Sequence, residues 1–152
     1  GSARIGALVL VDAVGIEVPG HPVADFFSLT LDQVAELSYH NPAAFRINLA
    51  AMSEEERRVM AGNREALAVY AGTDMSEKGL NGRLPQIKVP TCVLWGASDR
   101  IADPGYGLAY ATAIPGAEFR LLPDTGHVPQ LETPGRLATA ILGFAAGIGD
   151  RS

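Results

Sequence analysis

Three short, nearly continuous apolar runs mark the chain, and each ends in a turn that carries an acid. The runs are RIGALVLVDAVG (4–15), VPTCVLWGASD (89–99) and AEFRLLPDTG (117–126), and the acids are Asp12, Asp99 and Asp124. Short runs rich in Val, Leu and Ile are typical of strands that are buried on both faces of a parallel sheet. Functional groups of open α/β sheets gather at the carboxyl ends of the strands, so these acids are the first candidates for a site.

Helix-start signals follow the second and third runs. Residues 103–114 begin with Asp and Pro, and residues 133–147 begin with Thr and Pro, which is an N-cap residue followed by proline at the first helical position. From residue 89 onward the order is therefore strand, helix, strand, helix. This alternation predicts an α/β protein with a parallel sheet and flanking helices.

The stretch between the first two runs carries helix signals and no strand signal. The signals occur in TLDQVAEL (30–37), NPAAFRINLAAM (41–52) and SEEERRVMAGNREALAVYAG (53–72), the first and third as capping boxes. We predict three helices there, followed by a linker over 73–88 that contains glycine and proline. The chain then divides into a sheet core, 4–16 and 85–148, and a helical insertion with its return linker, 17–84. The insertion is expected to form a lid over the carboxyl ends of the strands.

Composition narrows the classes of partner. Twelve Lys and Arg residues are scattered along a chain of net charge −5, which argues against a nucleic-acid groove or an anionic membrane surface as partner. No apolar run approaches the roughly 20 residues that span a bilayer, and no signal peptide is visible. Cys92 is the single cysteine, and no metal-type Cys/His spacing occurs. We expect a cytoplasmic protein, with Cys92 as a small buried side chain within a strand.

Two motifs carry a family resemblance. GASDRIADP (96–104) and GHVPQLETP (126–134) each follow a predicted strand and precede a capped helix. Their order and spacing resemble the C-terminal part of the α/β-hydrolase fold, after the strand that carries the nucleophile. The resemblance covers nearly the whole chain and implies a partial α/β-hydrolase fold. It also implies that Asp99 is the catalytic acid and His127 the catalytic base.

The residue types suit those roles. An imidazole has an unperturbed pKa of about 6.5, and a carboxylate on one ring nitrogen fixes the tautomer and stabilises the imidazolium. Two alternatives stay open: Asp99 could be a turn or cap residue, and Asp12 could be the acid, because some members of the fold carry it after the earlier strand. His21 and His40 fall in the insertion and are interpreted as surface or capping histidines.

The nucleophile of the resemblance has no counterpart in this sequence. The family carries it on a G-x-S-x-G elbow between a strand and a helix, and no G-x-S-x-G occurs here; Ser98 is adjacent to the acid. We expect the elbow and the oxyanion hole to lie upstream of residue 4. The strand at 5–12 would then lack a neighbour, and an apolar unpaired edge favours association. We therefore expect self-association or pairing with an N-terminal half.

The resemblance implies a parent enzyme that hydrolyses an ester or related carbonyl compound by a Ser-His-Asp mechanism, without cofactor or metal. This chain alone would be inactive. The expected substrate is small and moderately apolar. The candidate residues of its pocket are Ile101, Val128, Phe26 and Phe27. The alternative is a non-catalytic binding or assembly module. A Rossmann-type nucleotide binder is disfavoured because no G-x-G-x-x-G follows a strand.

Overall fold

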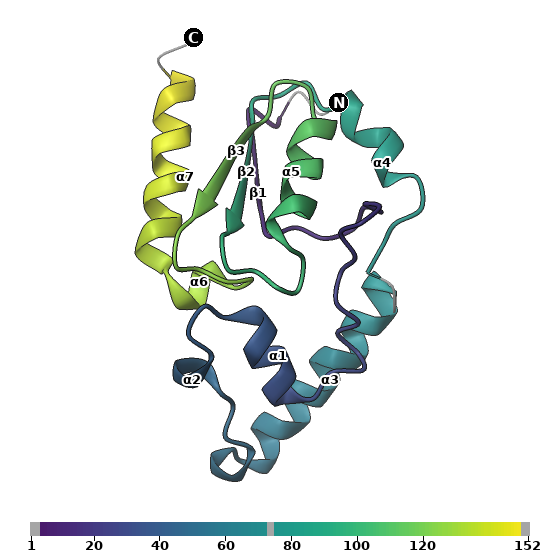
Figure 1. Ribbon diagram of the computed structural model, residues 1–152, viewed down its shortest axis with the longest axis vertical. Coiled ribbons are helices and arrows are strands. Elements are labelled where there is room, and N and C mark those ends of the chain that lie inside the picture. The colour runs from purple at the N-terminus through teal and green to yellow at the C-terminus, as the bar shows by residue number, and fades with distance from the viewer. Residues whose placement is uncertain (1–3, 73–74, 150–152) are drawn as a thin grey trace.

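The computed structural model describes residues 4–72 and 75–149, and its centre is a parallel sheet (Figure 1). The strands are β1 (Leu8–Val11), β2 (Thr91–Gly96) and β3 (Glu118–Leu122). They lie in the order β1-β2-β3, with Leu10 opposite Val93 and Val93 opposite Phe119. All three apolar runs are thus strands, and the predicted α/β class with a parallel sheet is confirmed.

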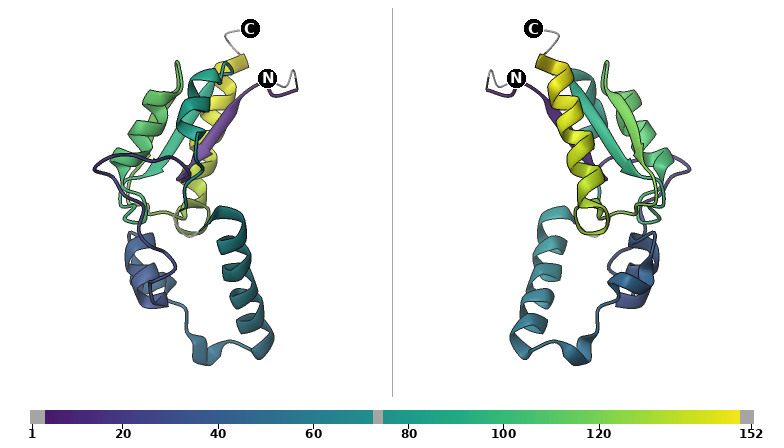
Figure 2. Two further views of the ribbon diagram at one scale, coloured as in Figure 1. Left: turned by 90° about the vertical axis from the view of Figure 1, so that its right-hand side faces the viewer. Right: turned by 90° about the vertical axis from the view of Figure 1, so that its left-hand side faces the viewer.

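Helices cover both faces of the sheet. Helix α5 (Pro104–Ala113) packs on one face and α7 (Pro134–Gly149) on the other (Figures 1 and 2). The central strand β2 is buried throughout, and its side chains alternate between two cores. Val93 and Trp95 join the core under α5, whereas Cys92 and Leu94 join the core under α7. The predicted burial of Cys92 is confirmed.

Close packing of α5 on the sheet depends on a glycine. A Cβ atom on Gly107 would overlap the indole ring of Trp95. The Trp95 Nε1–H donates to the carbonyl of Ala102 at 2.9 Å, so the buried ring also fixes the turn before α5. The Tyr106 hydroxyl on α5 bonds the backbone of Ile16, donating to its carbonyl at 2.7 Å and accepting from its N–H at 2.9 Å. These contacts tie the segment after β1 to the core.

The insertion begins with helices at the carboxyl ends of the strands, where the arrowheads point in Figure 1, and returns to a short helix near the opposite end of the sheet. The elements are α1 (Leu31–Ser38), α2 (Pro42–Phe45), η1 (Leu49–Ala51), α3 (Glu54–Ala71), α4 (Leu80–Arg83) and η2 (Leu84–Gln86). Both predicted capping boxes form, at Thr30 with Gln33 and at Ser53 with Glu56. The proposed division into a core (4–16 and 85–148) and a lid with its return linker (17–84) remains a prediction.

The helix predicted over 41–52 is broken, so that prediction is wrong. Helix α2 ends at Phe45, and Asn41 makes no side-chain cap. The backbone N–H of Asn41 instead donates to Glu132 at 2.9 Å. Arg46 is extended, and Asn48 starts a new 3₁₀ turn by accepting a hydrogen bond from the N–H of Ala50 at 3.1 Å. A second competing cap within the segment therefore ends the first helix early.

The predicted linker over 73–88 is more ordered than expected, because α4 and η2 lie within it. Thr73 and Asp74 of that linker lie outside the described residues. No helix among residues 4–72 and 75–149 is both long enough and apolar enough to cross a membrane.

Candidate active site

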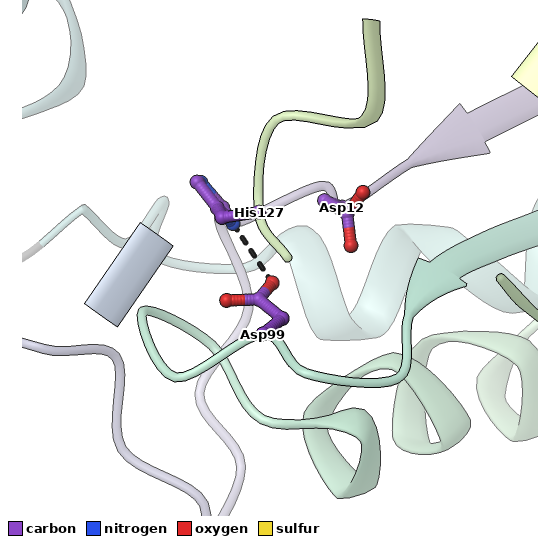
Figure 3. A group of neighbouring side chains, drawn as sticks. All are labelled: Asp12, Asp99 and His127. Carbon is purple, nitrogen blue, oxygen red and sulfur yellow. Dashed lines mark hydrogen bonds and ion pairs between the residues drawn. The ribbon is translucent and has the colours of Figure 1, made fainter. Parts of the chain in front are cut away.

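The candidate site lies where the strands end. Asp12 follows β1, Asp99 lies in the turn after β2, and His127 lies in the loop after β3 (Figure 3). The Nδ1 atom of His127 is 2.8 Å from Oδ2 of Asp99. Because a carboxylate only accepts, Nδ1 carries the proton and Nε2 is the ring nitrogen left to face a reactant. The structure thus brings together the two residues that the sequence placed in the acid and base roles.

Asp99 uses its two carboxyl oxygens for two different tasks. Its side chain is fully buried. Oδ1 accepts the N–H groups of Ile101 at 2.8 Å and Ala102 at 3.1 Å, while Oδ2 faces His127. The turn interpretation and the acid interpretation of Asp99 are therefore compatible. The turn bonds fix the carboxylate at the position from which it orients the imidazole.

The histidine loop is held from two sides. The N–H of His127 donates to the carbonyl of Ser38 at 2.7 Å. The N–H of Gly126 donates to Glu132 on the short helix α6 (Pro129–Glu132) at 2.7 Å. A Cβ atom on Gly126 would overlap the Ser38 carbonyl, so glycine is needed for this close approach. The contact with Ser38 links the loop to the insertion and had no signal in the sequence.

The electrostatic environment favours a charged imidazole. Burial lowers the pKa of His127, but the hydrogen bond and charge of Asp99, together with the charge of Asp12, outweigh burial and raise it above its ordinary value. The His127 side chain is 24% exposed. Within the described residues no group hydrogen-bonds Nε2. The histidine is therefore oriented on one side and accessible on the other, as a general base requires.

Asp12 does not take the place of the acid. Its side chain hydrogen-bonds the N–H of Gly96 at 2.7 Å and not His127. Burial, the largest influence, raises the pKa of Asp12 from 3.8 to about 7, although the Gly96 hydrogen bond acts in the opposite direction. The neighbouring charge of Asp99 raises it further. Asp12 is thus a second buried carboxyl group beside the Asp99–His127 pair, whereas the sequence offered it only as an alternative acid.

Asp12, Asp99 and His127 also carry the ligand types that bind cations, and they are the one such cluster among the described residues. One ligand atom from each of Asp12, Asp99 and His127 lies within 4.8 Å of the others. Both oxygens of Asp99 already accept hydrogen bonds, from the backbone and from His127. A cation at Asp99 would have to displace His127 from Oδ2. The arrangement fits a proton-transfer pair better than a metal centre.

The four predicted pocket residues fall in two places. Ile101 and Val128 flank Asp99 and His127 along the chain. Phe26 and Phe27 lie in the insertion, where the Arg64 guanidinium stands 5.1 Å and 5.7 Å from their ring centres.

An apolar cavity of about 560 Å³ lies between α1 and α3 and is lined in part by Phe26. Its lining includes neither Asp99 nor His127. A shared substrate pocket of all four residues remains a prediction.

The other histidines bond to polar neighbours on the core. Nδ1 of His21 is 2.8 Å from Oδ1 of Asp103, which also caps α5 by accepting the N–H of Gly105 at 2.7 Å. Nδ1 of His40 is 2.8 Å from the hydroxyl of Ser98. Both side chains are nearly half exposed, at 43% and 47%. The predicted N-cap role of Asp103 is confirmed, and Ser98 bonds His40 and not His127.

Comparison with known proteins points to one family. The family model described as alpha/beta hydrolase fold matches residues 62–134. Human monoacylglycerol lipase ABHD6 is 30% identical over 76 residues, which are 50% of this chain and 23% of the lipase. A 2-hydroxy-6-oxononadienedioate/2-hydroxy-6-oxononatrienedioate hydrolase of Paraburkholderia phymatum is 37% identical over 62 residues, which are 41% of this chain and 22% of that hydrolase.

Solved structures give the same fold. A thermophilic esterase from Thermogutta terrifontis superposes with a TM-score of 0.64 at 24% identity, covering 95% of this chain and 57% of the esterase. A membrane phospholipase A superposes with a TM-score of 0.71 at 21% identity, covering 95% of this chain and 50% of the phospholipase. The chain has an α/β-hydrolase fold, and the comparisons support a place in that family. Its aligned part spans about a quarter of these curated relatives and about half of these structures.

Proposed function

We propose that this chain supplies the acid and base of a hydrolase that cleaves an ester or a related carbonyl compound. The observation that carries the proposal is the buried Asp99 carboxylate 2.8 Å from Nδ1 of a partly exposed His127. The relatives named as a lipase and a hydrolase support the same class of reaction.

The proposed chemistry assigns one task to each residue. A serine oxygen attacks the substrate carbonyl, and Nε2 of His127 accepts the serine proton. The Asp99 carboxylate stabilises the imidazolium that forms and keeps Nε2 directed at the reactant. His127 then gives the proton to the leaving oxygen, and water repeats the sequence to release the acid product. In this proposal no metal or cofactor takes part.

The nucleophile would enter beside β1. The N–H groups of Leu8 and Asp12 donate to the carbonyls of Pro90 and Leu94, at 2.9 Å and 3.1 Å. The backbone hydrogen-bonding groups of the even-numbered residues of β1 therefore point toward β2. By strand alternation the backbone groups of Val9 and Val11 face the opposite side, and within the described chain no strand pairs with them. We propose that a strand carrying the G-x-S-x-G elbow pairs there, which would set the elbow beside His127.

The substrate would be small and moderately apolar. The cavity between α1 and α3 is lined mainly by apolar side chains, including Leu29, Val34 and Leu67. Such a lining suits the acyl or alkyl part of an ester better than a charged group. The open edge of β1 also supports a second candidate function, a non-catalytic module that assembles through that edge.

The test separates these two functions. The proposal predicts that the reading frame containing this sequence encodes, before residue 4, a strand followed by G-x-S-x-G. A fluorophosphonate probe, which forms a covalent bond with activated serines, should then label the longer protein at that serine. The His127→Ala variant should label far more slowly, and a His21→Ala variant, which leaves the dyad intact, should label like the parent. A frame without the elbow, or labelling that is indifferent to His127, would favour the assembly module.

A further inference from the structure

Asp12 holds a buried carboxyl oxygen that has no partner. Its backbone is left-handed, with φ of 41°, a conformation that is uncommon outside glycine and that aspartate adopts more readily than most residues. The residue is only 6% exposed. One oxygen is satisfied by the N–H of Gly96, whereas Oδ2 is the single buried side-chain oxygen or nitrogen without a hydrogen bond in the described chain. An unpartnered carboxylate oxygen in this position would be strongly disfavoured.

The groups that face Asp12 cannot satisfy that oxygen while it is ionised. Asp99, after β2, and His127, after β3, are the titratable groups that act on it, and no Lys or Arg side chain does. His127 already gives its Nδ1–H to Asp99. Asp99 offers only acceptors when ionised. The partner available to Oδ2 is therefore an oxygen acceptor, and the pairing needs a proton on Asp12.

We propose that Asp12 is a positioning residue that holds a proton at neutral pH and donates it to the Asp99 carboxylate. One polar atom from each of the two carboxyl groups and the imidazole lies within 4.8 Å of the others, and the three groups then share two protons and one negative charge. Two nearby carboxylates cannot both ionise cheaply, which is the physical basis of a shared proton. The role of this arrangement in catalysis rests on the proposed function, whereas the protonation of Asp12 is independent of it.

The arrangement has a consequence for the base. When Asp12 loses its proton, a second negative charge appears beside His127 and raises the pKa of the imidazole. The two groups therefore titrate as a coupled pair. Asparagine at position 12 keeps an oxygen for Gly96, presents an N–H to Asp99 and cannot ionise. It is also better tolerated than most residues in the left-handed region.

The test uses this chain as it is. Carbon-13 NMR of the Asp12 carboxyl carbon follows its protonation directly, and nitrogen-15 spectra follow His127, with His21 and His40 as internal references. We expect the Asp12 carbon to titrate well above the ordinary range of an aspartate. Asp12→Asn removes the charge that appears when Asp12 ionises, so the pKa of His127 should fall by no more than about 0.6 to 2.4, the Coulomb limits at about 5 Å for an effective dielectric constant of 80 to 20.

The carbon-13 measurement needs no variant, so it decides the matter even if Asp12→Asn folds poorly. An Asp12 carbon that titrates near pH 4 would overturn the proposal. The outcome is independent of hydrolysis. A longer protein without a reactive serine would refute the proposed function and leave the shared proton standing, while a normal Asp12 titration in an active enzyme would do the reverse.

Discussion

Replacing Asp12 by asparagine should remove a pH-dependent cost to folding. The pKa of Asp12 is about 7 in the folded chain against an ordinary value of 3.8, so the folded state binds the proton more tightly. The stability that this group provides is complete below pH 3.8 and is lost as the pH rises through 7. About 3 pKa units at 1.36 kcal/mol each give roughly 4 kcal/mol between these limits. Hydration of the site raises the effective dielectric constant and would lower this pH-dependent contribution to stability to about 2 kcal/mol.

The assay is urea denaturation at pH 4 and pH 8, at one ionic strength and one protein concentration. The free energy of unfolding of the parent should fall relative to that of Asp12→Asn by about 2 to 4 kcal/mol between these pH values. Asp124→Asn is a matched control, because Asp124 also follows a strand in a left-handed conformation but its side chain is 64% exposed. Its pH dependence should follow the parent. Parallel curves for the parent and Asp12→Asn would refute the reasoning.

Three further predictions concern the fold around the site. In Gly96→Ala the new Cβ would overlap the backbone carbonyl of Gly126, which cannot move without displacing His127. We expect the free energy of unfolding to fall by about 1 to 3 kcal/mol and the proton NMR signal of the His127 Nδ1–H to weaken. An undisturbed signal would contradict this account. Asp103→Ala removes the cap of α5 and the partner of His21; thermal or urea unfolding should show a loss of about 1 kcal/mol, whereas Asp103→Asn, which can still cap, should lose less. Val9→Pro removes an N–H that faces away from β2, whereas Val9→Ala loses the same packing but keeps the N–H. Sedimentation equilibrium should therefore show weaker self-association for Val9→Pro than for Val9→Ala. Equal association of the two variants would exclude the β1 edge as the contact.

The sheet was predictable because its signal is local. The three strands are short apolar runs with β-branched residues, and the helices that cover them begin at Asp103 and Thr133. Capping boxes at Thr30 and Ser53 likewise depend on residues three positions apart. Asn41 makes no side-chain cap, and its backbone N–H donates to Glu132, far away in the chain. Local signals cannot register such a distant contact.

The proximity of Asp99 and His127 was predictable for a different reason. Asp99 and His127 follow successive strands of one parallel sheet, whose carboxyl ends meet at one edge. What the sequence could not predict is how the carboxyl oxygens are shared. Whether Asp12 contacts His127, Asp99 or water depends on a left-handed backbone angle and on the close approach of Gly96, which no spacing encodes. The Ser38 carbonyl that holds the histidine loop is a backbone group and leaves no trace in residue type.

The central claim is that Asp99 and His127 act as the acid and base of a serine hydrolase. The most direct measurement is kcat/KM for a short p-nitrophenyl ester, with the longer protein that carries the elbow and with its His127→Ala and Asp99→Asn variants. The account predicts losses of several orders of magnitude, about 10⁴-fold for Asp99→Asn because the wrong tautomer is favoured. Variants that hydrolyse the ester at nearly the parental rate, while remaining folded, would contradict it.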